Sequence, residues 1–183
     1  MQHLTTEELE RGLPLIRQSP SDEGILQLIV RRPAVGAREV VQEAELDPVL
    51  GLVGDNWPKR GSALTLDGSA HPLMQLNIMN SRVAALVAQA ADRWQLAGDQ
   101  LFIDLDLSPV NLPAWTKLSL GGAIIEVTDQ PHSGCHKFRG RFGVDAMKFV
   151  NSTVGRELHL RGINARVIRG GVIRVGDVAR KVA

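Results

Sequence analysis

The chain has 183 residues, of which 44% are hydrophobic and 22% are charged, and it contains a single cysteine. This length and composition suit one domain over residues 1–183 with a sizeable core, and they argue against a disordered chain. There is no apolar run near the roughly 18 residues that span a bilayer, no secretory leader pattern at the start, and no second cysteine for an internal disulfide, so we expect a cytoplasmic protein without membrane contact.

The net charge of +1 conceals an uneven distribution along the chain. Residues 1–129 carry 10 Lys and Arg against 17 Asp and Glu, whereas residues 130–183 carry 11 against 3. A basic surface attracts anionic ligands, but two oppositely charged halves can equally pair with each other within one fold. We expect the pairing to account for most of the asymmetry.

The first 53 residues predict one helix followed by two strands. Thr5 and Glu8 have the spacing of a capping box, which predicts a helix over residues 5–18 that ends before Pro20. The apolar, β-branched run over residues 24–30 predicts a buried strand, and residues 38–46 predict a second one.

The middle of the chain predicts a loop and then a helix. Residues 54–72 are dense in Gly, Pro, Asp and Asn, which favours a loop with a short strand at 63–66. Asn80 or Ser81 can cap a helix that ends at Gly98, because apolar side chains recur at helical spacing between them.

Short strands separated by glycine turns dominate the remainder. The predicted strands cover residues 101–107, 117–120, 123–127, 158–160, 165–168 and 172–175, with one short helix at 144–151. This pattern is typical of a barrel or a folded antiparallel sheet, so we predict a mostly β, barrel-like fold with a few helices.

The segment around Cys135 carries the strongest chemical signal. Between Gln130 and Val144 the chain has two histidines and three Lys or Arg, with no acidic residue. Nearby positive charge stabilises a thiolate, and Gly134, Gly140 and Gly143 allow a ligand to approach the backbone. A reactive Cys135 and a buried, purely structural Cys135 are both compatible with these residues.

Other sites receive less support. His132, Cys135 and His136 are zinc-ligand types, but structural zinc needs a second ligand pair, and His71 and His159 are isolated. The same two histidines are candidate distant partners for a Cys–His hydrolase. Nucleic-acid binding is weakly supported, because few aromatic side chains accompany the basic residues of the C-terminal third.

Five segments of the chain, in order, resemble the MOSC domain family, which is named for the C-terminal domain of molybdenum cofactor sulfurase. The resemblance covers residues 24–180, with residues 5–18 as an additional N-terminal helix. The matching segments are Gly51–Asp55, Gly98–Leu101, Lys117–Thr128, His132–Phe138 and Gly162–Asp177.

The resemblance implies a barrel-like fold whose cysteine ligates molybdenum or carries a sulfur atom, which here is Cys135. It implies the molybdenum cofactor, without pyridoxal phosphate, and a molybdenum-dependent oxidoreductase or a sulfur transferase with a redox, sulfur-donor or sulfur-acceptor partner. The remaining alternatives are a persulfide carrier and a non-catalytic β-barrel binding module with a structural Cys135. The candidates for cofactor binding are Lys137, Arg139, Arg141, His132 and His136, with Lys59 and Arg60 as outside candidates.

The sequence also departs from the family pattern. Asn56 follows Gly54-Asp55 where relatives often have Arg, Gln100 replaces an Asn, and Phe102 and Ile103 replace a polar pair. We expect these positions to form part of the pocket wall and to make it less polar.

Overall fold

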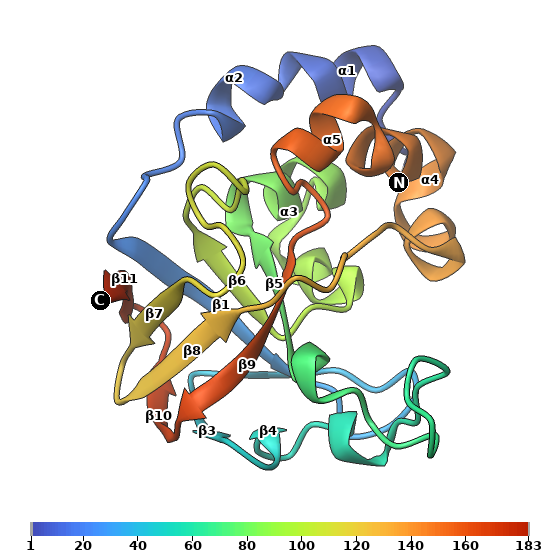
Figure 1. Cartoon of the computed structure of the whole chain (residues 1–183). Coiled ribbons are helices and arrows are strands. Elements are labelled where there is room, and N and C mark those ends of the chain that lie inside the picture. Colours follow the sequence, from blue (N-terminus) through green and yellow to red (C-terminus); the bar gives the residue numbers. More distant parts are fainter. Residues whose placement is uncertain (1, 183) are drawn as a thin grey trace.

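A closed β-barrel with helices packed against one side forms the body of the protein in the computed structural model, which describes residues 2–182 (Figure 1). Eight strands form one sheet in the order β11-β7-β8-β9-β5-β6-β1-β2, and an additional pairing of β11 with β1 closes seven of them into the barrel. The strands of this sheet are β1 (Gly24–Arg31), β2 (Glu39–Val41), β5 (Leu76–Asn80), β6 (Leu101–Asp104), β7 (Lys117–Leu120), β8 (Ala123–Val127), β9 (Ile163–Arg169) and β11 (Val178–Val182). The predicted mostly β, barrel-like fold is confirmed.

A smaller sheet packs beside the barrel. It has the order β10-β3-β4 and consists of β10 (Gly171–Arg174), β3 (Glu43–Asp47) and β4 (Gly51–Leu52). Strands β5 and β6 are parallel, with Ile78 opposite Leu101. A parallel pair needs a crossover between its strands, which is provided by α3 (Ser81–Ala88) and the 3-10 helix η3 (Ala91–Ala97).

Alternation along β6 divides the buried side chains into two cores. Leu101 and Ile103 point into the barrel, while Phe102 between them packs on the helical side with Val83 and Phe138. Successive side chains of a strand face opposite sides, so a strand that is apolar throughout is covered on both faces. Burying each of these large side chains contributes about 1.5–3 kcal/mol.

Four further helices pack with α3 on the same side of the barrel: α1 (Thr6–Arg11), α2 (Leu13–Ile16), α4 (His136–Asn151) and α5 (Thr153–Glu157) (Figure 1). The predicted capping box is confirmed, since Thr5 N donates to Glu8 Oε2 at 2.8 Å and Glu8 N donates to Thr5 Oγ1 at 3.3 Å. The single helix predicted over residues 5–18 is instead divided at Gly12, just before Pro14 in α2.

Five other predictions were wrong in part or in full. The helix predicted to end at Gly98 ends at Ala88 and is followed by η3, and the strand predicted over residues 38–46 is divided into β2 and β3. Residues 63–66 and 158–160 form turns instead of strands, since no neighbouring strand pairs with them. The helix predicted at 144–151 begins instead at His136. Phe138, Phe142 and Phe149 form one apolar stripe, and its burial outweighs the low helix propensity of the two glycines in this helix. Gly143, with φ 92°, kinks this helix.

Ion pairs join the two oppositely charged parts of the chain, as expected. Arg166 Nη2 lies 2.6 Å from Glu126 Oε1, and Arg174 Nε lies 2.6 Å from Glu43 Oε2. Arg180 Nε lies 3.0 Å from Glu23 Oε1. Much of the positive charge of strands β9, β10 and β11 is therefore paired with acidic residues that precede residue 130. Within residues 2–182, no helix is both long and apolar enough to cross a membrane.

Candidate functional site

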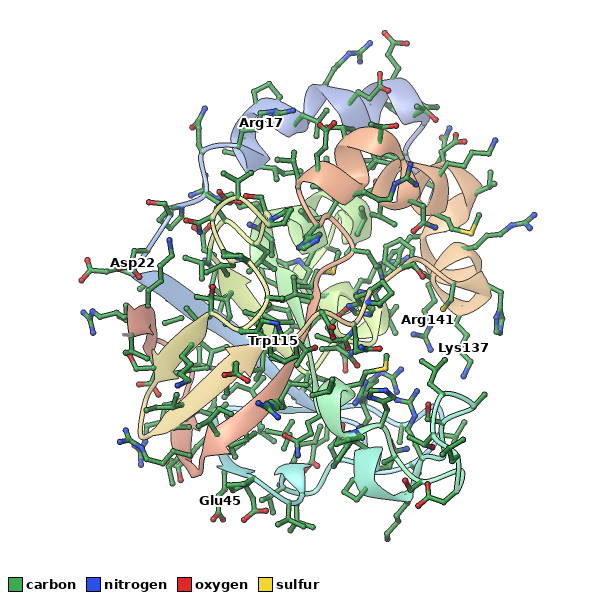
Figure 2. The ribbon with its side chains drawn as sticks, viewed as in Figure 1. Arg17, Asp22, Glu45, Trp115, Lys137 and Arg141 are labelled. Atoms are coloured by element: carbon green, nitrogen blue, oxygen red, sulfur yellow. The ribbon has the colours of Figure 1, made fainter. Side chains whose placement is uncertain are left out.

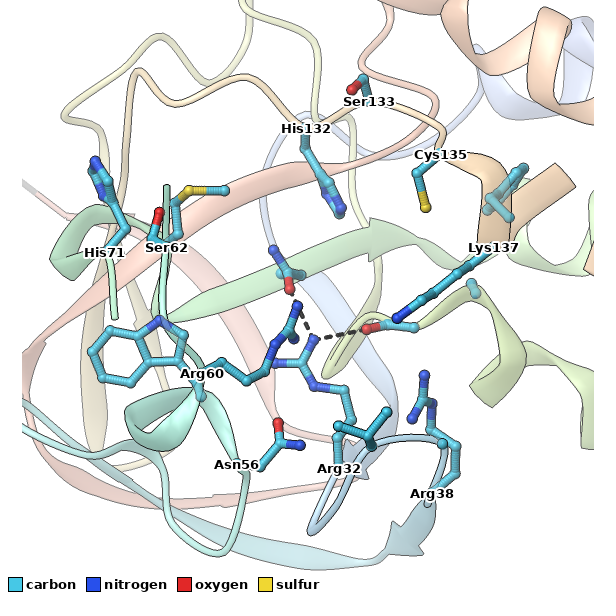
Figure 3. A pocket seen from close by; sticks show the side chains of 18 of the residues that line it. Arg32, Arg38, Asn56, Arg60, Ser62, His71, His132, Ser133, Cys135 and Lys137 are labelled. Carbon is cyan, nitrogen blue, oxygen red and sulfur yellow. Dashed lines mark hydrogen bonds between the residues drawn. The ribbon is translucent and has the colours of Figure 1, made fainter. Parts of the chain in front are cut away.

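Cys135 is exposed and lies on the wall of a cavity of about 370 Å³ at the start of α4 (Figure 3). This volume falls within the usual range for small-molecule sites. The cavity is walled by the loop after β1, the loop between β4 and β5, residues 97 and 98, the segment 132–133 and the first turns of α4. The sequence places most of these segments far apart, and the barrel brings their ends together.

Helix α4 begins immediately after Cys135, which is its N-cap residue. The preceding turn is held by Asn151 at the other end of the same helix. Gly134 N donates to Asn151 Oδ1 at 2.8 Å, and Asn151 Nδ2 donates to Gly134 O at 3.0 Å. A Cβ on Gly134 would lie 2.9 Å from Val150 Cγ2, so a larger residue would push this turn away.

A chain of amides anchors the strand side of the same segment. Asn164 on β9 donates to Gln130 O at 3.1 Å and accepts from Asn77 Nδ2 at 2.7 Å. Asn77 Oδ1 in turn accepts from Arg32 Nη1 at 2.9 Å. The floor of the pocket and the Cys135 segment are therefore connected by side-chain hydrogen bonds.

Two buried arginines at the base of the pocket are neutralised by carboxylates. Arg32 Nε and Nη2 donate to the two oxygens of Asp55 at 2.8 and 2.9 Å. Arg161 Nη1 donates to both oxygens of Asp99 at 2.9 and 2.7 Å. These pairs fix the floor, and their charges largely cancel.

Four further cations line the pocket without a carboxylate partner among the described residues: Arg38, Arg60, Lys137 and Arg141. Figure 3 shows Lys137 and Arg38 on one side of the pocket and Arg60 on the other. An excess of unpaired positive charge in a concave, partly desolvated site favours an anionic ligand.

Arg38 and Arg141 converge at Gly98. An added Cβ on this glycine, whose φ is +94°, would lie 3.6 Å from Arg141 Nη1 and 3.7 Å from Arg38 Nη2. Arg141 Nη1 donates to Leu96 O, and Arg38 Nε donates to Gln95 O at 3.2 Å. Burial lowers the pKa of Arg38, and the neighbouring Arg141 and Arg32 lower it further. A bound anion would relieve this repulsion.

His132 points into the pocket beside Cys135 (Figure 3). Its Nδ1 has no hydrogen-bond partner among the described residues and lies 3.6 Å from Asp99 Oδ1. Burial lowers the pKa of His132 well below its usual range, and Arg161 and Arg32 lower it further. His132 is therefore a neutral imidazole at neutral pH.

The structure brings some of the predicted site residues together and separates others. Cys135, His132, Lys137, Arg141 and the outside candidate Arg60 line the pocket. Arg139, His136 and Lys59 are exposed and are not among its lining residues, so the expected positions of these three are corrected. The reason is helical: Lys137 and Arg141 are four residues apart on one face of α4, and Arg139 lies between them on another face.

Sequence reasoning missed three pocket arginines: Arg32, Arg38 and Arg161. Arg32 directly follows β1 and precedes Pro33, and a charged residue just after an apolar strand is a usable signal. Arg161 gave no local signal, because its partner Asp99 is 62 positions away.

The departures from the family pattern fall in two places. Asn56 lines the pocket, and its Oδ1 is buried without a hydrogen-bond partner among the described residues. Gln100, Phe102 and Ile103 are fully buried and lie outside the pocket lining, so the expectation that they form its wall was wrong. Gln100 instead donates to Gln75 O at 2.9 Å and supports the barrel.

The other candidate zinc or hydrolase histidines, His71 and His159, each contact a backbone group. Within residues 2–182, no three His, Cys, Asp or Glu side chains gather as a metal-ion site. His71 also lines the pocket, and its Nδ1 accepts a hydrogen bond from Leu73 N at 3.2 Å. His159 instead contacts Leu107 O through Nδ1 at 2.9 Å.

Comparisons with known proteins identify relatives of the fold. No family model matches the chain, and no curated protein sequence matches it. Among solved structures, YuaD from Bacillus subtilis superposes with a TM-score of 0.62 at 13% identity, covering 85% of this chain and 93% of that one. YiiM from Escherichia coli superposes with a TM-score of 0.56 at 20% identity, covering 87% of this chain and 70% of that one. YiiM from Geobacillus stearothermophilus superposes with a TM-score of 0.53 at 15% identity, covering 88% and 74%. YuaD and YiiM are MOSC-domain proteins, and this chain shares their fold.

Proposed function

We propose that the chain is a MOSC-domain protein that binds the molybdenum cofactor, with Cys135 as the protein ligand to the metal. One observation carries the proposal: an exposed cysteine lies on the wall of a cavity that also presents four cations, none of which has a carboxylate partner within residues 2–182. Thiolate is a soft ligand, and positive side chains hold phosphate groups, so both ends of such a cofactor find suitable partners.

The pocket residues fit this cofactor in a further respect. The buried, unpartnered Oδ1 of Asn56 is an acceptor for a ligand N–H group. Because an unsatisfied buried polar atom costs about 1–3 kcal/mol, a ligand that satisfies it gains affinity. The cofactor, when bound, would supply the redox chemistry of molybdenum, which makes a molybdenum-dependent oxidoreductase the proposed enzyme class.

Different pocket residues would hold different parts of the cofactor. Cys135 would hold the metal, while Arg38, Lys137 and Arg141 would hold the phosphate group. Arg32 and Arg161 are committed to Asp55 and Asp99, so they would shape the floor and add little net charge. The neutral His132 would donate or accept one hydrogen bond beside Cys135 without adding a charge.

The experiment is to purify the protein from a molybdenum-replete host and to measure molybdenum and oxidised-pterin fluorescence together. Arg38→Ala and Arg141→Ala should each reduce both signals severalfold, because each removes a phosphate donor. Arg139→Ala is the matched control on the same helix and should retain both. Equal retention by all three variants would contradict the assigned phosphate site.

A second candidate is a persulfide carrier, and the exposure of Cys135 favours it because a partner protein can reach the thiol. In that case cyanide-releasable sulfur should accompany the protein, and molybdenum should be absent from the wild type. The third alternative, a binding module with a structural Cys135, required a buried thiol, and that part of it is wrong.

A further inference from the structure

The pocket wall opposite α4 carries a second set of ligand-binding groups. The 3-10 helix η1 (Trp57–Lys59) lies in the loop between β4 and β5, with Asn56 before it and Arg60 after it. Arg60 N donates to Trp57 O at 3.0 Å, which closes the turn. Residues three apart in a 3-10 turn lie on the same side, and both Trp57 and Arg60 line the pocket.

The turn is held rigidly from below. Asp55 accepts from Trp57 N at 2.9 Å while its carboxylate is fixed by Arg32. Asn56 N donates to Arg32 O at 2.9 Å. The indole and the guanidinium are thus presented by backbone that is anchored to the pocket floor.

The Arg60 guanidinium has no hydrogen bond or ion pair with any residue of the described part of the chain. Its pKa is lowered by burial and by Arg32, while Asp55 acts in the opposite direction. Arg60 is exposed to solvent at the pocket wall, and an anionic group that enters the pocket can form a charge-assisted contact with its guanidinium.

Charge balance argues that one phosphate does not satisfy the whole pocket. A phosphate monoester carries about −1.5 to −2 at pH 7, whereas four cations lack a carboxylate partner. Arg38, Lys137 and Arg141 lie together on the α4 side, and Arg60 lies across the cavity from Lys137 and Arg38 (Figure 3). Arg60 is therefore left for a second anionic group.

We propose that Trp57 and Arg60 form a separate subsite for a planar organic anion, which is the substrate that reacts beside Cys135. Its ring lies on Trp57, and its carboxylate or other oxyanion meets Arg60. This inference rests on the proposed function, since it concerns the substrate of the same pocket.

The test titrates the purified protein with 4-nitrobenzoate, a planar carboxylate that quenches tryptophan fluorescence on contact, in saturating inorganic phosphate. We expect saturable quenching that persists in phosphate, is lost in Trp57→Phe, and is not produced by the neutral analogue 4-nitrobenzamide. Arg60→Gln should weaken binding roughly tenfold or more, because it removes a charge-assisted contact. Lys59→Gln, which removes a neighbouring charge outside the pocket lining, should change affinity less than twofold.

Three outcomes would overturn the subsite. Displacement of 4-nitrobenzoate by phosphate would show that both anions share one site. Equal effects of Arg60→Gln and Lys59→Gln on affinity would show non-specific electrostatic attraction. Quenching that is retained in Trp57→Phe would show that the probe binds elsewhere. Failure of the cofactor proposal would appear differently, as missing molybdenum and pterin, and it would leave the titration result unchanged.

Discussion

Asn151 and Gly134 exchange two hydrogen bonds, so the last residue of α4 holds the turn that immediately precedes its N-cap, Cys135. Figure 2 shows Lys137 and Arg141 beside α4 at the edge of the molecule, and both side chains line the pocket. The position of the thiol therefore depends on a side chain 16 residues further along the chain.

Asn151→Ala should lower the free energy of unfolding by about 1–3 kcal/mol, because it removes both bonds and leaves Gly134 N without its partner. It should also change the rate at which Cys135 is alkylated in the native protein. Urea unfolding and alkylation kinetics measure the two effects. Thr153→Ala, at an exposed neighbouring position, is the control and should alter neither.

The cations of the pocket should attract anionic thiol reagents to Cys135. At low salt, Lys137→Gln and Arg141→Gln should slow modification by the anionic reagent 5,5′-dithiobis(2-nitrobenzoate) more than modification by the neutral reagent 4,4′-dithiodipyridine, and added salt should reduce the difference. Stopped-flow absorbance gives both rates. Arg139→Gln should match the wild type; if it slowed the anionic reagent as much as Arg141→Gln does, the helical-face assignment would be incorrect.

Buried Asp55 and Arg32 should contribute far more to stability than an exposed pair. Asp55→Asn should cost about 3–5 kcal/mol in unfolding free energy, because it leaves the Arg32 guanidinium buried without its counter-charge. Glu39→Gln breaks the exposed pair with Arg31 and should cost below about 1 kcal/mol. Similar losses in the two variants would argue against a structural role for Asp55.

Stability should fall in mildly acidic solution, in part because of His132. Its folded pKa is well below its usual range, so the unfolded chain binds the extra proton first as the pH falls through about 6.5. The contribution of His132 to the free energy of unfolding is fully present above that pH, and it is lost as the pH falls towards the pKa of His132 in the folded protein.

His132→Gln should therefore lose less stability between about pH 7.5 and 5.5 than the wild type does. Urea unfolding at each pH gives the slopes, and comparing slopes removes any uniform destabilisation by the substitution. His136→Gln, at an exposed position, should keep the wild-type slope. Parallel profiles for the wild type and His132→Gln would contradict a depressed pKa.

Local signals in the sequence were sufficient for part of the fold and for identifying the segment that places Cys135 on the pocket wall. The capping box of Thr5 and Glu8 and the alternating strands depend on residues a few positions apart, and the structure contains them. The start of α4 was missed because Gly140 and Gly143 argued for a loop, whereas burial of Phe138 and Phe142 against the helical core stabilises a helix.

The pocket itself could be predicted only in part. Cys135, Lys137 and Arg141 lie within one short segment whose composition is unusual. Arg38 and Arg161 enter the pocket through tertiary pairing of the barrel, which no local pattern encodes.

The most direct test of the cofactor assignment is the molar ratio of molybdenum to protein in the wild type and in Cys135→Ala, both purified from the same molybdenum-replete host. The account predicts molybdenum near stoichiometric levels in the wild type and its loss in Cys135→Ala, with circular dichroism showing that the variant is folded. Wild-type protein that lacks molybdenum, or a folded Cys135→Ala variant that retains it in full, would contradict the assignment of Cys135 as the metal ligand.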